Sequence, residues 1–138
     1  MRHLGLGVDH IFEWQAGGVT KSNMDVVIDC ADPQRLERFW RAALGYRSLL
    51  SVEDVVVLVA VNEVHPPLVL QRVPEAKNGK NRVHIDLVSD DIEAEVVRLE
   101  GLGARRLHDG LRNMGPARWV TMADPDDNEF CVCTGVEW

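Results

Sequence analysis

The sequence of 138 residues has room for one domain, or for two fused units of half that size. A formal net charge of −7 and a pI of about 5.1 argue against nucleic acid or an anionic membrane as a partner, because both require a positively charged surface. No stretch approaches the roughly 18 apolar residues that span a bilayer, and three cysteines, an odd number, favour free thiols in the cytoplasm.

Residues 1–23 are the least regular part of the chain. Apolar residues such as Phe12 and Trp14 precede the pair Gly17-Gly18, and a polar stretch follows. This pattern predicts an N-terminal extension that is either poorly ordered or an arm that packs on a partner subunit, with an additional strand as the alternative.

Residues 24–30 alternate as a strand does, with Val26 and Ile28 on one face. The pair Asp32-Pro33 is a strong helix start, because Asp caps the first turn and Pro fits the first helical position. An apolar stripe of period 3.6 then reaches Leu44, and Gly45 ends the helix. Three strand-like segments and a polar loop follow at residues 46–52, 55–61, 67–73 and 74–81.

The same order then returns. Residues 82–88 alternate strictly and predict a strand, and residues 91–102 predict an amphipathic helix. The remaining expected segments are a short strand, a Gly/Pro loop and two strands joined by a turn, at residues 104–108, 109–116, 118–123 and 128–134.

The two halves of the chain are a repeat. Residues 25–32 align with residues 84–91, and each copy continues into an apolar helix that ends in Leu-Gly. The repeat predicts an α+β fold of two tandem βαβββ modules, residues 24–74 and 82–135, within one domain of residues 24–138. If the two sheets curl toward each other, they form a cup, which is a partly open barrel.

Strand alternation sorts the side chains into two faces. Apolar residues are expected to face the helices: Val26, Ile28, Val83, Ile85, Leu87, Phe130 and Val132. The opposite, cup-facing side carries Asp25, Asp29, Val69, Gln71, Arg82, His84, Asp86, Glu129, Cys131 and Cys133. One imidazole, several carboxylates and a thiol suit either a divalent metal or an acid–base site.

The sequence resembles the vicinal oxygen chelate superfamily, which includes glyoxalase I, extradiol dioxygenases, fosfomycin-resistance enzymes and bleomycin-binding proteins. The resemblance covers about residues 24–135, is nearest to the glyoxalase-like subgroup, and rests on four motifs: Asp32-Pro33 with Phe39-Trp40 and Leu44-Gly45-Tyr46, Arg82 to Leu87, Leu99 with Leu102-Gly103-Ala104, and Asp124 to Phe130.

The resemblance implies four metal-ligand positions, which fall on Asp25, Gln71, His84 and Cys131. Relatives usually carry His at the first and third of these positions and Glu at the second and fourth, so only His84 keeps the usual type. The expected cofactor is one divalent metal, Zn, Fe, Mn or Ni, with a metal-free protein as the alternative. Lactoylglutathione lyase activity is not expected from this ligand set.

Roles follow for the other cup residues. His84, Asp25 and Glu129 are the candidates for holding a metal or moving a proton, and Arg82, Asp86 and Trp119 are the candidates for substrate contact. These residues also have ordinary structural interpretations. They are a His84 bonded to Asp86 or Arg82, a strand-start carboxylate at Asp25, an exposed Glu129 paired with an arginine, a salt bridge from Arg82, a packed Cys131 thiol, and Trp119 in a packing role.

Besides a mainly structural dimeric domain without retained chemistry, the sequence leaves two functions open. One is an enzyme of the lyase, isomerase or dioxygenase type that acts on a small molecule in the cup with help from a metal. The other is a metal-free protein that sequesters a small molecule, as in bleomycin resistance, with an acidic cup suited to an organic cation. The resemblance also implies a homodimer.

Overall fold

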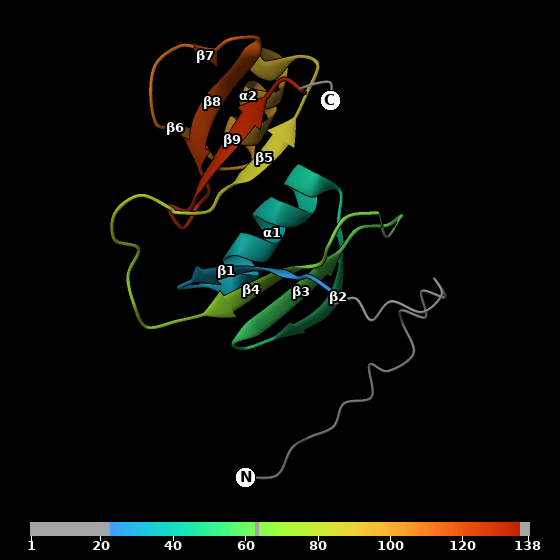
Figure 1. Cartoon of the computed structure of the whole chain (residues 1–138). Coiled ribbons are helices and arrows are strands. Elements are labelled where there is room, and N and C mark those ends of the chain that lie inside the picture. The colour runs from blue at the N-terminus through green and yellow to red at the C-terminus, as the bar shows by residue number, and fades with distance from the viewer. Residues whose placement is uncertain (1–22, 63, 136–138) are drawn as a thin grey trace.

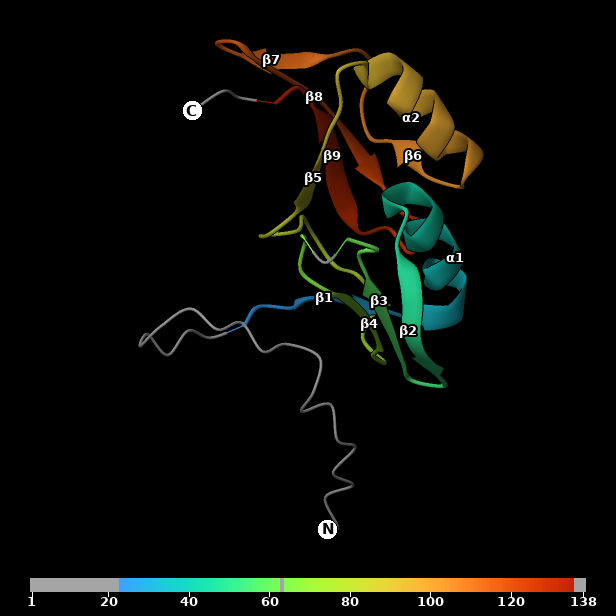
Figure 2. The ribbon, with the colours of Figure 1, turned by 90° about the vertical axis from the view of Figure 1, so that its right-hand side faces the viewer.

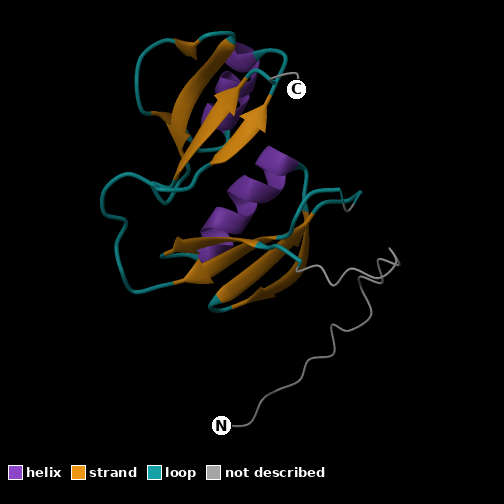
Figure 3. Ribbon diagram, viewed as in Figure 1, coloured by secondary structure: helices purple, strands orange, loops and turns teal. Residues whose placement is uncertain are grey.

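The computed structural model describes residues 23–62 and 64–135, which form two α+β modules, each with one helix and one mixed sheet (Figures 1 and 3). Except for Asn23, the expected N-terminal extension of residues 1–23 lies outside the described residues. No helix within the described ranges is long and apolar enough to cross a membrane.

The first module has the predicted βαβββ order. Its elements are β1 (Val26–Cys30), α1 (Pro33–Leu44), β2 (Arg47–Val52), β3 (Val55–Val59) and β4 (Leu68–Arg72). The sheet runs in the order β1-β4-β3-β2, and its only parallel pair joins β1 to β4. This places the first strand of the module at an edge of the sheet, with one side unpaired in the described structure.

The second module repeats this order with one additional strand. Its elements are β5 (Ile85–Val88), α2 (Ile92–Gly101), β6 (Arg105–Arg106), β7 (Arg112–Met114), β8 (Ala117–Ala123) and β9 (Glu129–Cys133). The sheet runs in the order β5-β9-β8-β6, with β7 paired to β8, so β5 is the edge strand that corresponds to β1.

Both helices begin where the sequence predicts. Asp32 accepts a hydrogen bond from the Arg35 backbone N–H at 3.1 Å, and Asp91 accepts one from the Ala94 N–H at 3.0 Å. These side chains satisfy amide donors that the first helical turn leaves free. Each helix therefore follows directly from the first strand of its module.

Two expectations for the second module are wrong. The strand predicted for residues 82–88 begins only at Ile85, and Val83 is 83% exposed instead of facing a helix. The loop predicted for residues 109–116 contains β7, which pairs with β8 through Arg112 and Trp119. Proline and glycine favoured a loop prediction here, and a strand of three residues is too short to show the alternation that predicts a strand.

The two helices lie on the same side of the two sheets, whose other faces remain open (Figure 2). A single apolar core on the helix side draws residues from both modules, and Phe130 of β9 packs against Phe39 and Trp40 of α1. The predicted helix-facing residues of β1, β5 and β9, Val83 excepted, do lie in or against this core. The sheets do not close, so the expected partly open cup is confirmed.

The end of β1 meets the turn between β8 and β9 at the junction of the modules. The Asn128 side chain donates to the Asp29 carbonyl at 3.1 Å, and the Ala31 N–H donates to Asp126 at 2.7 Å. A cavity of about 430 Å³ lies between the modules and is lined by Val26 of β1, by Leu44 at the end of α1, and by β5, including Asp86. The cup therefore has two walls, one from each sheet.

Candidate functional site

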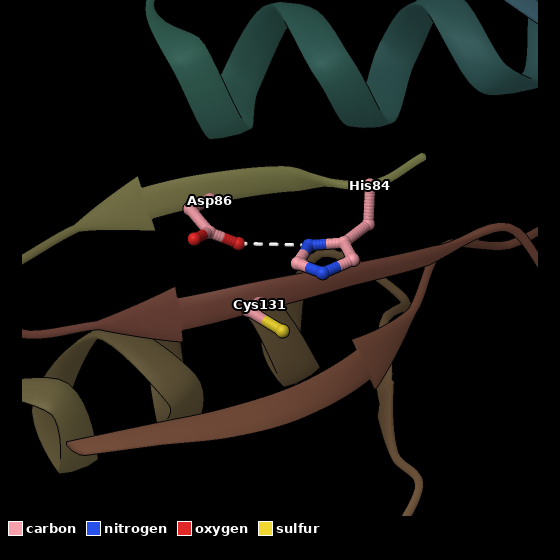
Figure 4. Close-up of side chains that lie close together, drawn as sticks. All are labelled: His84, Asp86 and Cys131. Carbon is pink, nitrogen blue, oxygen red and sulfur yellow. Dashed lines mark ion pairs between the residues drawn. The ribbon is translucent and has the colours of Figure 1, made fainter. Parts of the chain in front are cut away.

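Three potential metal-binding side chains lie together on the cup side of the second module. The ligand atoms of His84, Asp86 and Cys131 are all within 4.8 Å of one another, and we call these residues the donor cluster. His84 Nδ1 is 2.8 Å from Asp86 Oδ1, and the Cys131 thiol lies beneath this pair (Figure 4). No other such group occurs in the described part of the chain.

The register of the second sheet explains why the donor cluster forms. Asp86 on β5 and Cys131 on β9 are direct partners in a parallel pairing. His84 stands two residues before Asp86, so it projects to the same side of the chain even though the strand has not yet begun. Two residues 45 positions apart in the sequence thus become neighbours through one pair of strands.

The thiol of the donor cluster is the buried member. Cys131 is 6% exposed, and its sulfur lies 3.7 Å from the Thr121 hydroxyl, whereas His84 and Asp86 are both open to solvent. Burial raises the pKa of the Cys131 thiol, and the negative charge of Asp86 raises it further. A thiol in this setting stays protonated until a cation stabilises the thiolate.

Glu129 has a different environment from the one expected of a catalytic base. Its carboxylate accepts hydrogen bonds from the Asn81 N–H at 3.1 Å and from Lys80 Nζ at 3.2 Å, and Lys77 lies 3.8 Å away. Burial by itself raises the pKa of this carboxyl, but the bonds from Lys80 and Asn81 outweigh it and hold the pKa below its usual range. Glu129 therefore anchors the segment between the modules to β9.

The first module adds no residue to the donor cluster. Asp25 and Gln71, which occupy two of the four expected ligand positions, are exposed and lie outside the group of converging ligand atoms. Arg82 is exposed before β5, and Trp119 is half-buried opposite Cys133 in the register of β8 and β9. Of the expected ligands, the structure brings together His84 and Cys131.

Asp86 is the third donor, although the sequence suggested it only as a substrate contact. The sequence did contain a signal that Asp86 lies beside His84: the two are two residues apart, and residues i and i+2 share one face of an extended chain. The structural role of His108 was also missed. Its Nε2 accepts a hydrogen bond from the Thr121 N–H at 3.0 Å, which joins the segment after β6 to β8.

The donor set fits a divalent cation. One imidazole, one carboxylate and one thiol are ligand types that Zn²⁺ accepts, and the thiol disfavours hard ions such as Mg²⁺ and Ca²⁺. Three protein donors would leave further coordination positions for small molecules. The cluster is therefore chemically suited to hold a metal, although it differs from the ligand set that the resemblance implied.

The comparison with protein families shows to which family the chain belongs. A model of the glyoxalase-like domain matches residues 25–133, which include both modules and the donor cluster. The chain belongs to the glyoxalase-like family. Within the vicinal oxygen chelate superfamily, this glyoxalase-like protein has the α+β architecture that its repeat predicted. A search of curated protein sequences found no significant match.

Solved structures share the fold of this glyoxalase-like protein at low sequence identity. The fosfomycin resistance protein FosX from Mesorhizobium loti is 16% identical, with a TM-score of 0.65 over 86% of this chain and 95% of its own. A lactoylglutathione lyase from Agrobacterium tumefaciens is 17% identical, with a TM-score of 0.61 over 85% and 96%.

A third structural relative of the glyoxalase-like protein is a glyoxalase/bleomycin resistance protein/dioxygenase family enzyme from Burkholderia phytofirmans. It is 13% identical, with a TM-score of 0.68 over 82% of this chain and 100% of its own. At these identities the similarity extends to the fold and not to a particular reaction.

Proposed function

We propose that this glyoxalase-like protein holds one divalent cation at His84, Asp86 and Cys131 and uses it to bind and convert a small molecule in the cup. The observation that supports the proposal is the convergence of three different ligand types within 4.8 Å on the cup side of β5 and β9. When bound, such a cation acts as a Lewis acid that stabilises negative charge on an oxygen of the substrate.

The protein residues prepare the site before any ligand arrives. His84 Nδ1 donates to Asp86 Oδ1 at 2.8 Å, so these two ligand atoms already face each other. A cation held by both would take the place of the proton between them, because a ligating imidazole nitrogen must be deprotonated. Thr121 positions the Cys131 sulfur from the neighbouring strand. Glu129 keeps the segment bearing Lys77 and Lys80 against the edge of the cup.

The softness of the donor set favours Zn²⁺ over Mn²⁺ among the metals considered. A thiolate ligand prefers Zn²⁺, whereas Mn²⁺ prefers sites made of oxygen donors. Because the first module contributes no donor to the described cluster, the cation belongs to the second module. This site therefore differs from the one that the resemblance implied, in which four ligands come from both modules.

Metal content and cobalt spectroscopy test the proposal. Protein purified without added metal should contain close to one equivalent of zinc by mass spectrometry, and Co²⁺ substitution should give a thiolate-to-cobalt absorption band. Cys131→Ser should abolish that band and weaken metal affinity at least about 100-fold, since even outer-shell partners of metal ligands contribute 10- to 100-fold. His84→Ala should also release the metal.

Cys133→Ser is the matched control, because Cys133 lies two residues further along β9 and outside the donor cluster. It should leave both the cobalt band and the metal affinity unchanged. If wild-type protein binds neither Zn²⁺ nor Co²⁺, or if Cys133→Ser has the same effect as Cys131→Ser, the metal site is wrong.

The metal-free binding protein is the second candidate. The bond between His84 and Asp86 supports it, because these two side chains satisfy each other without a cation. Absence of metal uptake together with thermal stabilisation by organic cations would favour this function. The homodimer and the cytoplasmic location stay predictions from the sequence, with sedimentation and fractionation as their tests.

A further inference from the structure

The cup wall from the first module carries a continuous row of apolar side chains. Cross-strand pairing places four residues directly opposite one another over all four strands, and we call them the apolar row: Val27, Val69, Val57 and Leu50. Val27 is 53% exposed and Leu50 is 41% exposed, whereas the two central valines are half-buried. The next row contains Val55 and Val52 beside Asp29 and Gln71.

An exposed sheet face of this composition is unusual. A sheet that packs a helix on one face normally presents alternating polar residues to water on the other. Here the helix-side face is filled by core residues such as Val56 and Leu70, and the apolar row makes part of the opposite face aliphatic as well. Contiguous exposed apolar surface of this kind marks a binding surface.

The apolar row and the donor cluster belong to the same open side of the molecule. Figure 2 shows both helices on one side of the two sheets. Strand alternation puts both groups of residues on the other side, because their neighbours along the strands, such as Leu70 and Leu87, lie in or against the core. β1 carries the first residue of the row, and β5 carries Asp86 of the cluster. Both edge strands border the cavity between the modules, which is lined by Val26 of β1 and by Asp86 of β5.

We propose that the ligand of the cup is amphipathic, with a polar head bearing oxygen donors at the donor cluster and an uncharged apolar body across the apolar row. The assignment of the head rests on the proposed metal function; the assignment of the body rests on the sheet face itself. Four strands spaced about 4.8 Å apart give the row a width of about 14 Å, which is the length available to the body.

The absence of charge in the row sets the chemistry of the body. None of its four side chains is ionisable, and the charges of the flanking rows stand at the sheet edges, Asp29 on β1 in one and Arg47, opposite Val59, on β2 in the other. A charged tail would lose hydration on this surface without gaining a partner, whereas an alkyl or aryl tail gains by leaving water. This places hydrophobic acids, hydroxamates and diols of medium length within the substrate class.

Two homologous ligand series separate the body from the head. The first is acetohydroxamate to octanohydroxamate, titrated calorimetrically into zinc-loaded protein. The second is 1-butanol to 1-octanol, titrated into metal-free protein by intrinsic fluorescence. Affinity should rise about two- to fourfold per methylene in both series, because each buried methylene contributes up to about 0.8 kcal/mol.

Threonine variants locate the body. Val57→Thr and Val69→Thr keep the shape of the side chain and place a hydroxyl in the row. Each should reduce the gain in affinity per methylene. The affinity for acetohydroxamate should not change, because this ligand has no chain long enough to cover the row. Val97→Thr, on the exposed face of α2, is the matched control and should change neither. Thermal melts confirm that each variant is folded.

The outcomes are distinguishable. If acetohydroxamate fails to bind but the alcohol series keeps its increment and its sensitivity to Val57→Thr, the metal function fails and the apolar wall stands. If affinity does not rise with chain length in either series, or if neither row variant changes that rise, the proposal of an amphipathic ligand is wrong. A flat response in a protein that dimerises with rising concentration assigns the row to a second copy and also overturns it.

Discussion

Asp124 shows at the scale of one residue how the two modules are locked together. It is 2% exposed, yet it accepts hydrogen bonds from Trp40 Nε1 at 3.1 Å and from the backbone N–H groups of Asp126 and Asn128 at 2.9 and 3.0 Å. The first bond crosses from one module to the other, and the other two shape the turn between β8 and β9. Burial nevertheless raises the pKa of Asp124 to about 6, and the charge of Asp126 contributes to the rise.

The raised pKa of Asp124 predicts a pH dependence with a defined sign. The folded state holds this proton up to about pH 6, whereas the unfolded chain releases it near pH 4. Between these values the folded state binds more protons, so the stability due to this group falls as the pH rises, by at most about 3 kcal/mol. Urea unfolding from pH 4 to pH 7 measures the fall.

Asp124→Asn should remove this part of the pH dependence, because the amide keeps an acceptor for the turn but has no charge to bury. Asp109→Asn, at an exposed carboxyl, is the matched control and should retain the wild-type profile. If Asp124→Asn and wild type change in parallel between pH 4 and pH 7, the assignment of the titration to Asp124 is wrong.

Individual site residues could be predicted only as far as local pattern reaches. The family resemblance implied four ligand positions, and the donor cluster contains two of them, His84 and Cys131. The place of Asp86 in the donor cluster was missed because its pairing with Cys131 depends on the register of two strands far apart in the sequence. Glu129 was given a catalytic role from strand alternation alone, which contains no information about the lysines that surround it.

At the scale of elements, Gly45 determines where α1 ends. Its φ of +66° lies in the left-handed region, its N–H bonds to the Arg41 carbonyl, and no atom lies within 4 Å of the position a Cβ would take. Gly45→Ala should therefore cost about 1 kcal/mol, purely from backbone strain. Chemical denaturation measures the change, and an unchanged midpoint would mean that the turn relaxes to another conformation.

Gly101 is the last residue of α2, and its replacement by alanine should change the stability in the opposite direction. It is the last residue of the helix, it has no left-handed φ, and a Cβ there would also meet nothing within 4 Å. Gly101→Ala should stabilise the protein by about 0.5 kcal/mol, because alanine loses less backbone freedom on entering a helix. A loss of stability in the same denaturation experiment would contradict this reasoning.

The elements were predictable to different degrees for physical reasons. Caps and a period of 3.6 are local signals, so α1 was predicted with its observed bounds and α2 within one residue at each end. The strand at residues 82–88 was too long because alternation continues through Val83, although that residue has no partner strand. β7 exists only because it pairs with β8, which sequence pattern does not record.

At the scale of the whole molecule, the two modules share one core. The Phe130 ring lies 5.3 Å from Trp40 and 5.9 Å from Phe39, centroid to centroid, so a strand of the second module fills a space beside the helix of the first. Arg98 of α2 donates to the Ala42 and Ala43 carbonyls at the end of α1. The repeat predicted the modules themselves, but the way they interlock arises from these contacts between distant residues.

A shared core predicts that the modules unfold together, and Phe130→Ala tests this. Removing a fully buried phenylalanine should cost about 3–5 kcal/mol, from lost burial and from the cavity left beside Trp40. Because the cavity opens onto both modules, amide hydrogen exchange should accelerate in β1 and β4 as well as in β8 and β9. Acceleration restricted to β8 and β9 would show that the first module is stable by itself, and the core would then consist of two independent halves in contact.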